Sequence, residues 1–144
     1  MSPEETILSN YQNVAMVGAS SNKERPSFKV FSYLTRQGYN VIPVNPNERE
    51  ILGKTSYPDL VSIPGKVDVV DIFRNPDQVM PIVDQAIKIG AKAVWMQEGV
   101  VNEDAAAMAR DAGLLVVMGK CMRKQLISLK RSKSYREHRQ QNGR

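Results

Sequence analysis

The chain has very few of the residues that hold metal centres and small disulfide-bonded domains together. Its 144 residues include one cysteine, Cys121, and one histidine, His138, and only 6% of them are aromatic. A single cysteine excludes an intramolecular disulfide, and these two residues provide too few ligands for a structural zinc site. No apolar run approaches the roughly 20 residues of a membrane span. Because the opening MSPEETILSNYQ lacks the basic start and apolar stretch of a secretory signal, we expect a cytoplasmic protein.

The formal charge of +5 is unevenly distributed along the chain. Residues 1–119 contain 11 Lys and Arg against 14 Asp and Glu, a net charge of −3. Residues 120–144 contain nine basic residues and one acidic residue, Glu137, a net charge of +8. The isoelectric point of 9.4 is therefore a property of the C-terminal segment. Charge-driven binding to nucleic acid is therefore expected only from that segment.

What the sequence does contain is a regular alternation of apolar runs and helical patterns. Runs rich in β-branched residues predict buried strands at 14–17, 41–44, 67–73, 91–96 and 114–118. Residues typical of helix starts and helix ends lie between these runs, namely Pro26, Asn75 and Asn102, and then Gly38, Gly90 and Gly113. Strands that alternate with helices pair in parallel, so we expect a small doubly wound, Rossmann-like α/β domain with three α/β/α layers.

Three further segments are less regular. Residues 54–57 predict a short edge strand, and residues 121–130 predict a last helix with an apolar face. The segment from residue 130 reads KRSKSYREHRQQNGR and has no apolar face, which is typical of a frayed or disordered tail. We therefore expect a domain over residues 1–129 and a basic tail over residues 130–144.

Small, polar and cationic residues collect at the carboxyl ends of the predicted strands, where open α/β sheets bind their ligands. After the first strand, a glycine, small residues and a helix start would present backbone N–H groups to an anion. The candidate residues of this loop are Gly18, Ala19, Ser20, Ser21, Lys23, Arg25, Pro26 and Ser27. The candidates at the other strand ends are Asn45, Pro46, Phe73, Arg74, Gln97, Gly99 and Cys121. Hydroxyl donors and cations together predict a diphosphate site in the first loop.

The dinucleotide fingerprint G-x-G-x-x-G is incomplete in this loop. Gly18 is present, but Ser20 and Lys23 occupy the positions of the second and third glycines. Asn45 ends the second strand, where NAD-binding domains carry the acidic residue that holds the ribose hydroxyls. The missing acid and the nearby cations favour a nucleotide with an additional phosphate.

The first loop reads Val17-Gly18-Ala19-Ser20 followed by Arg25-Pro26-Ser27, and the second strand ends in Pro43-Val44-Asn45-Pro46. With these and further motifs, the chain resembles the stand-alone coenzyme A-binding domain proteins, which are related to the nucleotide-binding domain of the succinyl-coenzyme A synthetase α subunit. The resemblance covers about residues 10–123 and rests on short motifs in family order. The motifs are Val17-Gly18-Ala19-Ser20, Arg25-Pro26-Ser27, Gly38-Tyr39, Pro43-Val44-Asn45-Pro46, Ile51-Leu52-Gly53, Val70-Asp71-Ile72-Phe73-Arg74, Gly90-Ala91-Lys92, Val94-Trp95-Met96-Gln97, Glu98-Gly99-Val100, Ala112-Gly113-Leu114 and Val116-Val117-Met118 with Cys121-Met122. One departure is Gly119-Lys120, where the family pattern has Asp-Arg.

The resemblance implies coenzyme A (CoA) or an acyl-CoA as the ligand. It implies that the loop over residues 18–27 and the following helix start hold the CoA diphosphate. Asn45 and Pro46 would lie near the adenosine, and Phe73, Arg74 and residues 97–99 would line the pantetheine side. Lys23, Arg25 and Arg74 are the candidates for the 3′-phosphate.

We expect a non-catalytic CoA-binding protein, because no nucleophile–base set, paired carboxylates or metal cluster is evident and His138 lies in the polar tail. One alternative is a small NAD(P)-dependent oxidoreductase or an accessory subunit of an acyl-CoA enzyme. A second alternative, less favoured, is nucleic-acid binding through the basic tail. Cys121 has two interpretations, a buried packing residue or a thiol that forms a mixed disulfide with CoA or a disulfide with a second chain.

Overall fold

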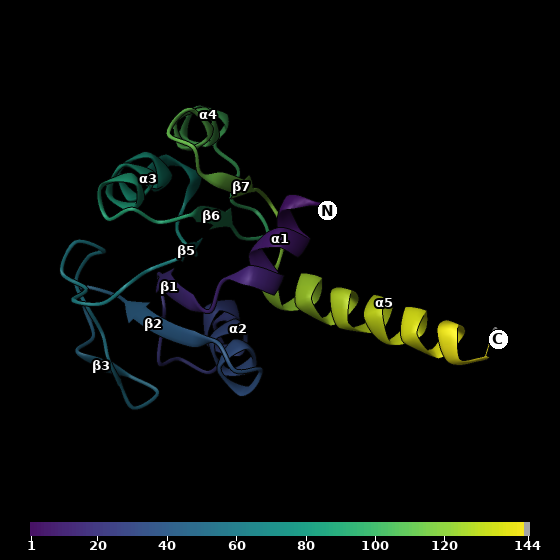
Figure 1. Ribbon diagram of the computed structural model, residues 1–144. Coiled ribbons are helices and arrows are strands. Elements are labelled where there is room, and N and C mark those ends of the chain that lie inside the picture. Colours follow the sequence, from purple (N-terminus) through teal and green to yellow (C-terminus); the bar gives the residue numbers. More distant parts are fainter. Residues whose placement is uncertain (143–144) are drawn as a thin grey trace.

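A five-stranded parallel sheet lies at the centre of the computed structural model, which describes residues 1–142, without the side chains of residues 135, 136 and 138–142 (Figure 1). The strands are β1 (Asn13–Val17), β2 (Asn40–Val44), β5 (Val69–Ile72), β6 (Ala93–Met96) and β7 (Leu115–Val117). Their spatial order is β2-β1-β5-β6-β7, so the winding direction reverses between β1 and β5. The predicted doubly wound parallel sheet is confirmed.

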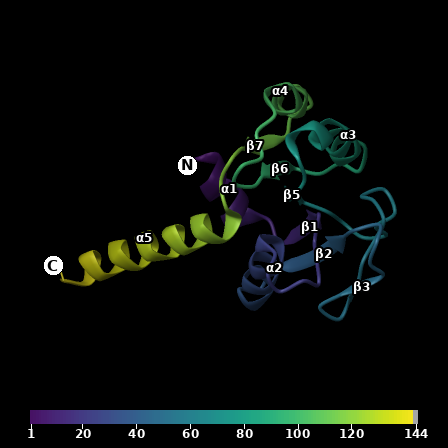
Figure 2. The same cartoon turned by 180° about the vertical axis from the view of Figure 1, so that it is seen from behind.

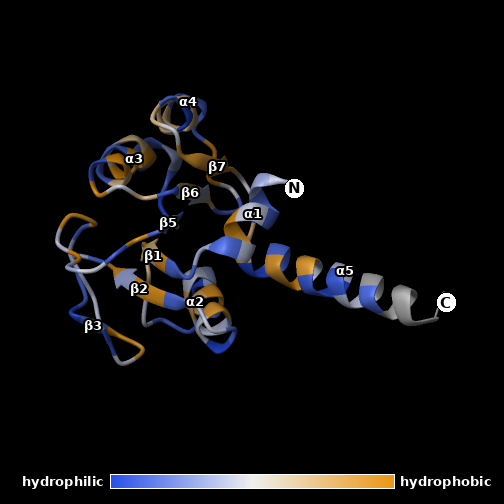
Figure 3. Cartoon of the chain, viewed as in Figure 1, coloured by the Kyte–Doolittle hydropathy of each residue, from blue (hydrophilic) through white to orange (hydrophobic). Residues whose placement is uncertain are grey.

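Helices cover both faces of the sheet and enclose two hydrophobic clusters. On one face, α1 (Pro3–Asn10), α2 (Pro26–Arg36) and the start of α5 (Met122–Asn142) pack around buried Phe31 and Trp95. On the other face, α3 (Val79–Lys88) and α4 (Glu103–Asp111) pack around Val83 and Ala106, and the 3-10 turn η1 (Pro76–Gln78) precedes α3. Figure 3 shows apolar residues along the strands and on the helix faces turned toward the sheet.

The helix ends follow the expected sequence signals. The Asn102 side chain accepts a hydrogen bond from the Ala105 N–H at 3.0 Å and caps α4. Asn75 and Gln78 form a reciprocal capping box at η1. The glycines after α2 and α3, Gly38 and Gly90, have φ of +94° and +75°, the left-handed conformation that ends a helix.

Two elements differ from the sequence-based expectation. The helix α1 was not predicted, although Ser2 begins a clear start signal and its hydroxyl caps the Glu5 N–H at 3.1 Å. The expected edge strand at 54–57 is a small antiparallel hairpin of β3 (Glu50–Ile51) and β4 (Lys54–Thr55). Tyr57, which follows the hairpin, forms a parallel bridge with Val44 at the edge of the main sheet.

The C-terminal segment also differs, because α5 continues to Asn142 where a disordered tail was expected from residue 130. Between Met122 and Asn142 there is no glycine or proline, and Lys, Arg, Gln and Glu are good helix formers. The apolar contacts of α5 with the domain end at Leu129. Beyond that point the helix projects away from the sheet in both views (Figures 1 and 2).

Within residues 1–142, none of the helices is long and apolar enough to cross a membrane.

Candidate functional site

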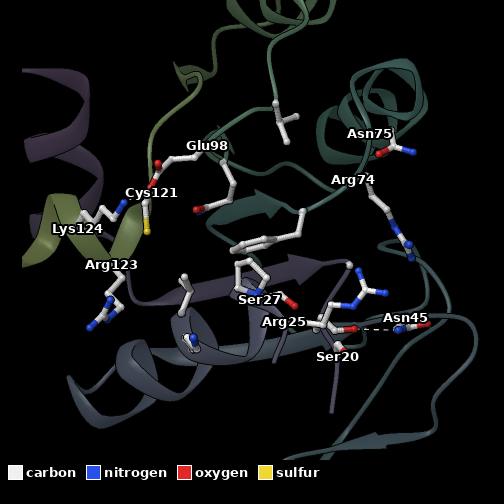
Figure 4. A pocket seen from close by; sticks show the side chains of 18 residues that line it. Ser20, Arg25, Ser27, Asn45, Arg74, Asn75, Glu98, Cys121, Arg123 and Lys124 are labelled. Atoms are coloured by element: carbon white, nitrogen blue, oxygen red, sulfur yellow. Dashed lines mark hydrogen bonds and ion pairs between the residues drawn. The ribbon is translucent and has the colours of Figure 1, made fainter. Parts of the chain in front are cut away.

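A cavity of about 650 Å³ opens at the carboxyl edge of the sheet, next to the point where the strand order reverses (Figure 4). Its walls come from the loop after β1, the start of α2, the ends of β2, β5 and β6, and the start of α5. The lining residues are Gly18, Ala19, Ser20, Arg25, Pro26, Ser27, Lys29, Val30, Asn45, Phe73, Arg74, Asn75, Gln97, Glu98, Val100, Cys121, Arg123 and Lys124. This volume and position are typical of a site for a cofactor-sized ligand.

The cavity brings together eleven of the fifteen candidate residues predicted from the sequence. These eleven are Gly18, Ala19, Ser20, Arg25, Pro26, Ser27, Asn45, Phe73, Arg74, Gln97 and Cys121. The sequence did not single out Val30, Val100 or Lys124 as candidate site residues, although they also line it. Their place depends on how α2 and α5 pack over the edge of the sheet, which a local pattern does not reveal.

Four predicted residues lie outside this cavity. Pro46 lines a neighbouring cavity of about 360 Å³, which shares Arg74 with the first. Ser21 is exposed, and both its N–H and its hydroxyl donate to the Glu48 carboxylate. Lys23 and Gly99 are exposed in loops next to the site. The Ser21 hydroxyl is therefore hydrogen bonded to Glu48, whereas Ser27 is buried at the cavity wall.

Gly18 allows the loop after β1 to lie directly against the end of β5. Its φ is +90°, and a Cβ atom at this position would lie 2.2 Å from the carbonyl oxygen of Phe73. Its N–H donates to the Val44 carbonyl at 3.0 Å, on the β2 side. Glycine is therefore required here both by the backbone conformation and by the approach of the neighbouring strand.

Asn45 joins the end of β2 to the first loop. Its Nδ2 donates to the Ala19 carbonyl at 2.8 Å, and its Oδ1 accepts from the Asn47 N–H at 2.8 Å (Figure 4). A carboxylate could accept the second bond but could not donate the first. This geometry explains why an amide stands at the position where NAD-binding domains carry an acid.

The N-terminus of α2 is the strongest anion-binding feature of the cavity. Its cap residue, Arg25, makes no side-chain cap hydrogen bond within the described residues, and Pro26 follows it in the first turn. The first turn has no acidic residue, and Ser27 places a buried hydroxyl at the cavity wall. Uncapped N–H groups, a hydroxyl and the positive end of the helix dipole together favour a bound phosphate.

The charged side chains of the cavity are mainly basic. Arg25 and Arg74 extend into the end near Asn45, and Arg123 and Lys124 lie at the opposite end beside Cys121 (Figure 4). Lys124 Nζ lies 2.8 Å from the Glu98 carboxylate, whose hydrogen bond and charge raise the pKa of Lys124. The guanidinium of Arg123 lies 5.6 Å from the centre of the Tyr33 ring. Arg25 and Arg74 are therefore the cations best placed for ligand phosphates.

The central part of the cavity is less polar. Phe73 and Val30 line it, and Cys121, which is half-buried, packs against the same hydrophobic cluster as Phe73. Gln97 is 3% exposed, and its Nε2 donates to Oδ1 of the fully buried Asp71. Burial raises the pKa of Asp71 to about 7, although the Gln97 hydrogen bond opposes this shift.

Comparisons with known proteins agree with this architecture. A family model described as a CoA binding domain matches residues 12–126. The Bacillus subtilis protein YneT, described as uncharacterized, is 34% identical over 117 residues, which cover 81% of this chain and 87% of that protein. A solved hypothetical protein from Pyrococcus horikoshii OT3 is 44% identical to this chain, with a TM-score of 0.83, and the match covers 85% of this chain and 86% of that one.

A larger enzyme subunit also contains a similar region. The α subunit of the ADP-forming acetate–CoA ligase II of Pyrococcus furiosus is 38% identical over 86 residues. That match covers 59% of this chain but only 19% of the ligase subunit. The similarity therefore concerns one region of the ligase and not the whole enzyme.

Proposed function

Because this chain belongs to the CoA-binding domain family, we propose that its cavity binds coenzyme A or an acyl-CoA without acting on it chemically. The observation that carries the proposal is the uncapped N-terminus of α2 beside Gly18 and Arg25 at the edge of the sheet. A diphosphate bound there would accept hydrogen bonds from first-turn N–H groups and from the Ser27 hydroxyl.

The adenosine part of the ligand would lie on the β2 side of the diphosphate. Here the smaller cavity is lined by Pro46 and Asn47 after β2 and by Leu60 and Arg74. Arg74 lines both cavities, so it lies between the proposed diphosphate and adenosine positions. This supports Arg74 over Lys23 as the partner of the 3′-phosphate, because Lys23 lines neither cavity.

The pantetheine arm would run in the opposite direction, across the ends of β5 and β6. Phe73 offers it an apolar surface, and Gln97 offers a hydrogen-bonding amide. The thiol end would then reach the start of α5, where Cys121 lines the cavity. A cavity with Arg25 and Arg74 at one end and apolar walls in the middle is compatible with such a ligand.

A binding role is supported by the state of the reactive groups around the cavity. The Glu98 carboxylate is paired with Lys124, and Asp71 is buried beneath the cavity wall. Within the described residues, no three His, Cys, Asp or Glu side chains gather as metal ligands would. The described cavity lining also lacks the serine–histidine or cysteine–histidine pairs of covalent catalysis.

The proposal is tested by calorimetric titration of the full chain with CoA, dephospho-CoA and NAD at one ionic strength. We expect CoA to bind most tightly, dephospho-CoA less tightly because it lacks the 3′-phosphate, and NAD most weakly. Mass spectrometry of ligand released from the purified protein is an independent check. Tighter binding of NAD than of CoA would contradict the proposal and favour the oxidoreductase alternative.

A further inference from the structure

Asp71 is a buried carboxyl group whose hydrogen bonds are incomplete. It lies on β5 between Met16 of β1 and Trp95 of β6, and is fully buried. Its Oδ1 accepts from Gln97 Nε2, and its Oδ2 has no hydrogen-bond partner among the residues that the structure describes. An ionised carboxylate with a single neutral donor is costly to bury, so burial favours the neutral form of Asp71 and the Gln97 hydrogen bond favours the charged form.

Gln97 connects Asp71 to the cavity. It follows β6 directly, is almost fully buried and lines the cavity wall. While Nε2 is directed at Asp71, the carbonyl Oε1 is the amide atom that is left for the cavity. An ionised carboxylate can only accept, so it requires the NH₂ group of Gln97, whereas a protonated carboxyl group can donate to the carbonyl.

We propose that Asp71 is a positioning residue: in its ionised form it presents the Gln97 carbonyl to the ligand, and in its protonated form it lets the amide turn and present NH₂. This inference rests on the proposed function, and it means that pH regulates ligand binding at the same site. The pantetheine arm carries amide N–H and thiol S–H groups, which donate hydrogen bonds. Such a ligand binds best when Gln97 offers its carbonyl, and therefore when Asp71 is ionised.

The surroundings of Asp71 are compatible with titration near neutral pH. Beside it, β1 and β6 contribute Met16 and Trp95, which are not titratable. The ionisable groups of the elements over this face are Glu4 and Glu5 of α1, Tyr11 after α1, Arg25 at the cap of α2, Lys29, Tyr33 and Arg36 of α2, Tyr39 after α2, Lys54 of β4, Glu98 after β6, and Lys120, Cys121, Arg123 and Lys124 around the start of α5. None of them is hydrogen bonded or ion paired with Asp71 in the described part of the chain. Burial raises the pKa of Asp71 to about 7.

The first test compares the dissociation constant for CoA in the wild type and in Asp71→Asn between pH 8 and pH 6. One linked proton at a group titrating near pH 7 weakens wild-type binding by about tenfold over this range. The 3′-phosphate of CoA also titrates, but it contributes equally in both proteins. We therefore expect a steeper dependence in the wild type, and weaker binding by Asp71→Asn at pH 8.

Asp68→Asn is the matched control, because Asp68 is also buried but lies at the amino edge, where it accepts from Asn13. We expect it to keep the wild-type pH dependence. Equal pH dependence in the wild type and Asp71→Asn, or tighter wild-type binding at pH 6, would overturn the inference. If the folded wild type binds no CoA at either pH, the proposed function fails instead.

A second test needs neither ligand nor a stable Asp71 variant. The side-chain amide signal of Gln97, assigned in ¹⁵N NMR spectra by its loss in Gln97→Met, is followed with pH in the ligand-free wild type. We expect its chemical shift to change with a midpoint near pH 7, because the amide follows the charge of Asp71. A Gln97 signal that does not titrate around neutral pH would overturn the inference.

Discussion

At the scale of single residues, Gly18 determines how closely the first loop approaches the sheet. We predict that Gly18→Ala lowers the free energy of unfolding by more than about 3 kcal/mol, because it combines backbone strain with a clash against the Phe73 carbonyl. Gly38→Ala is the matched control: its φ is similar, but nothing in the described structure lies within 4 Å of the added Cβ. It should cost about 1–2 kcal/mol. Equal losses in chemical denaturation would contradict the proposed close approach.

Arg25 is the residue whose loss should separate binding from stability. We predict that Arg25→Ala weakens CoA binding by about 1.5–3 kcal/mol, the range for a hydrogen bond to a charged group. Its side chain is exposed and makes no cap hydrogen bond within the described residues, so thermal stability should not change. Arg36→Ala, in the last turn of the same helix, is the control and should bind CoA normally. Wild-type affinity in Arg25→Ala would show that Arg25 is a solvated surface residue that does not contact the ligand.

Cys121 lines the cavity at the end proposed for the CoA thiol. We predict that oxidised CoA, a disulfide, reacts with the Cys121 thiolate to give a mixed disulfide and release one CoA thiol. Intact-mass analysis should show one CoA adduct that dithiothreitol removes, and Cys121→Ser should show none. If the wild-type mass stays constant while CoA is bound, Cys121 serves packing alone.

At the scale of secondary-structure elements, α5 has two parts with different surroundings. Its first turns pack Met122 and Leu126 into the core and contribute Arg123 and Lys124 to the cavity. The described side chains from Arg131 to Ser134 are exposed, and the helix projects away from the sheet there. The cavity and the projecting part should therefore be separable by truncation.

We predict that deletion of residues 131–144 leaves the CoA dissociation constant within about twofold of the wild type, because the cavity and the apolar contacts are kept. The deletion removes five basic residues and one acidic residue. Any salt-sensitive binding of the full chain to RNA or DNA should then disappear, as measured by fluorescence anisotropy. A large loss of CoA affinity would show that the projecting part acts on the cavity.

The elements also show what the sequence could and could not predict. The five buried strands and the helix ends at Gly38 and Asn102 follow from local patterns, because each depends on residues adjacent in the chain. The helix α1 was missed because only Ile7 and Leu8 bury an apolar face in it. The continuation of α5 was not predicted, because the segment from residue 130 has no apolar face to pack and its helix rests on the propensity of Lys, Arg, Gln and Glu.

At the scale of the whole molecule, most of the candidate site follows from the rule that strand ends meet at one edge of a parallel sheet. That rule locates Gly18, Asn45, Phe73 and Gln97, but it gives no side-chain contacts. The engagement of Ser21 by Glu48 depends on a contact between residues 27 positions apart. Such contacts depend on packing between distant segments, which a single sequence does not reveal.

The cavity is assembled from both ends of the domain, since its walls include Gly18 after the first strand and Lys124 in the last helix. An unfolded chain cannot bring these segments together, so a ligand of this cavity stabilises only the folded state. At a free concentration about a hundred times its dissociation constant, such a ligand adds about 2.7 kcal/mol to the free energy of unfolding. Cellular proteases degrade the unfolded population, so the abundance of this protein should rise and fall with the supply of its ligand.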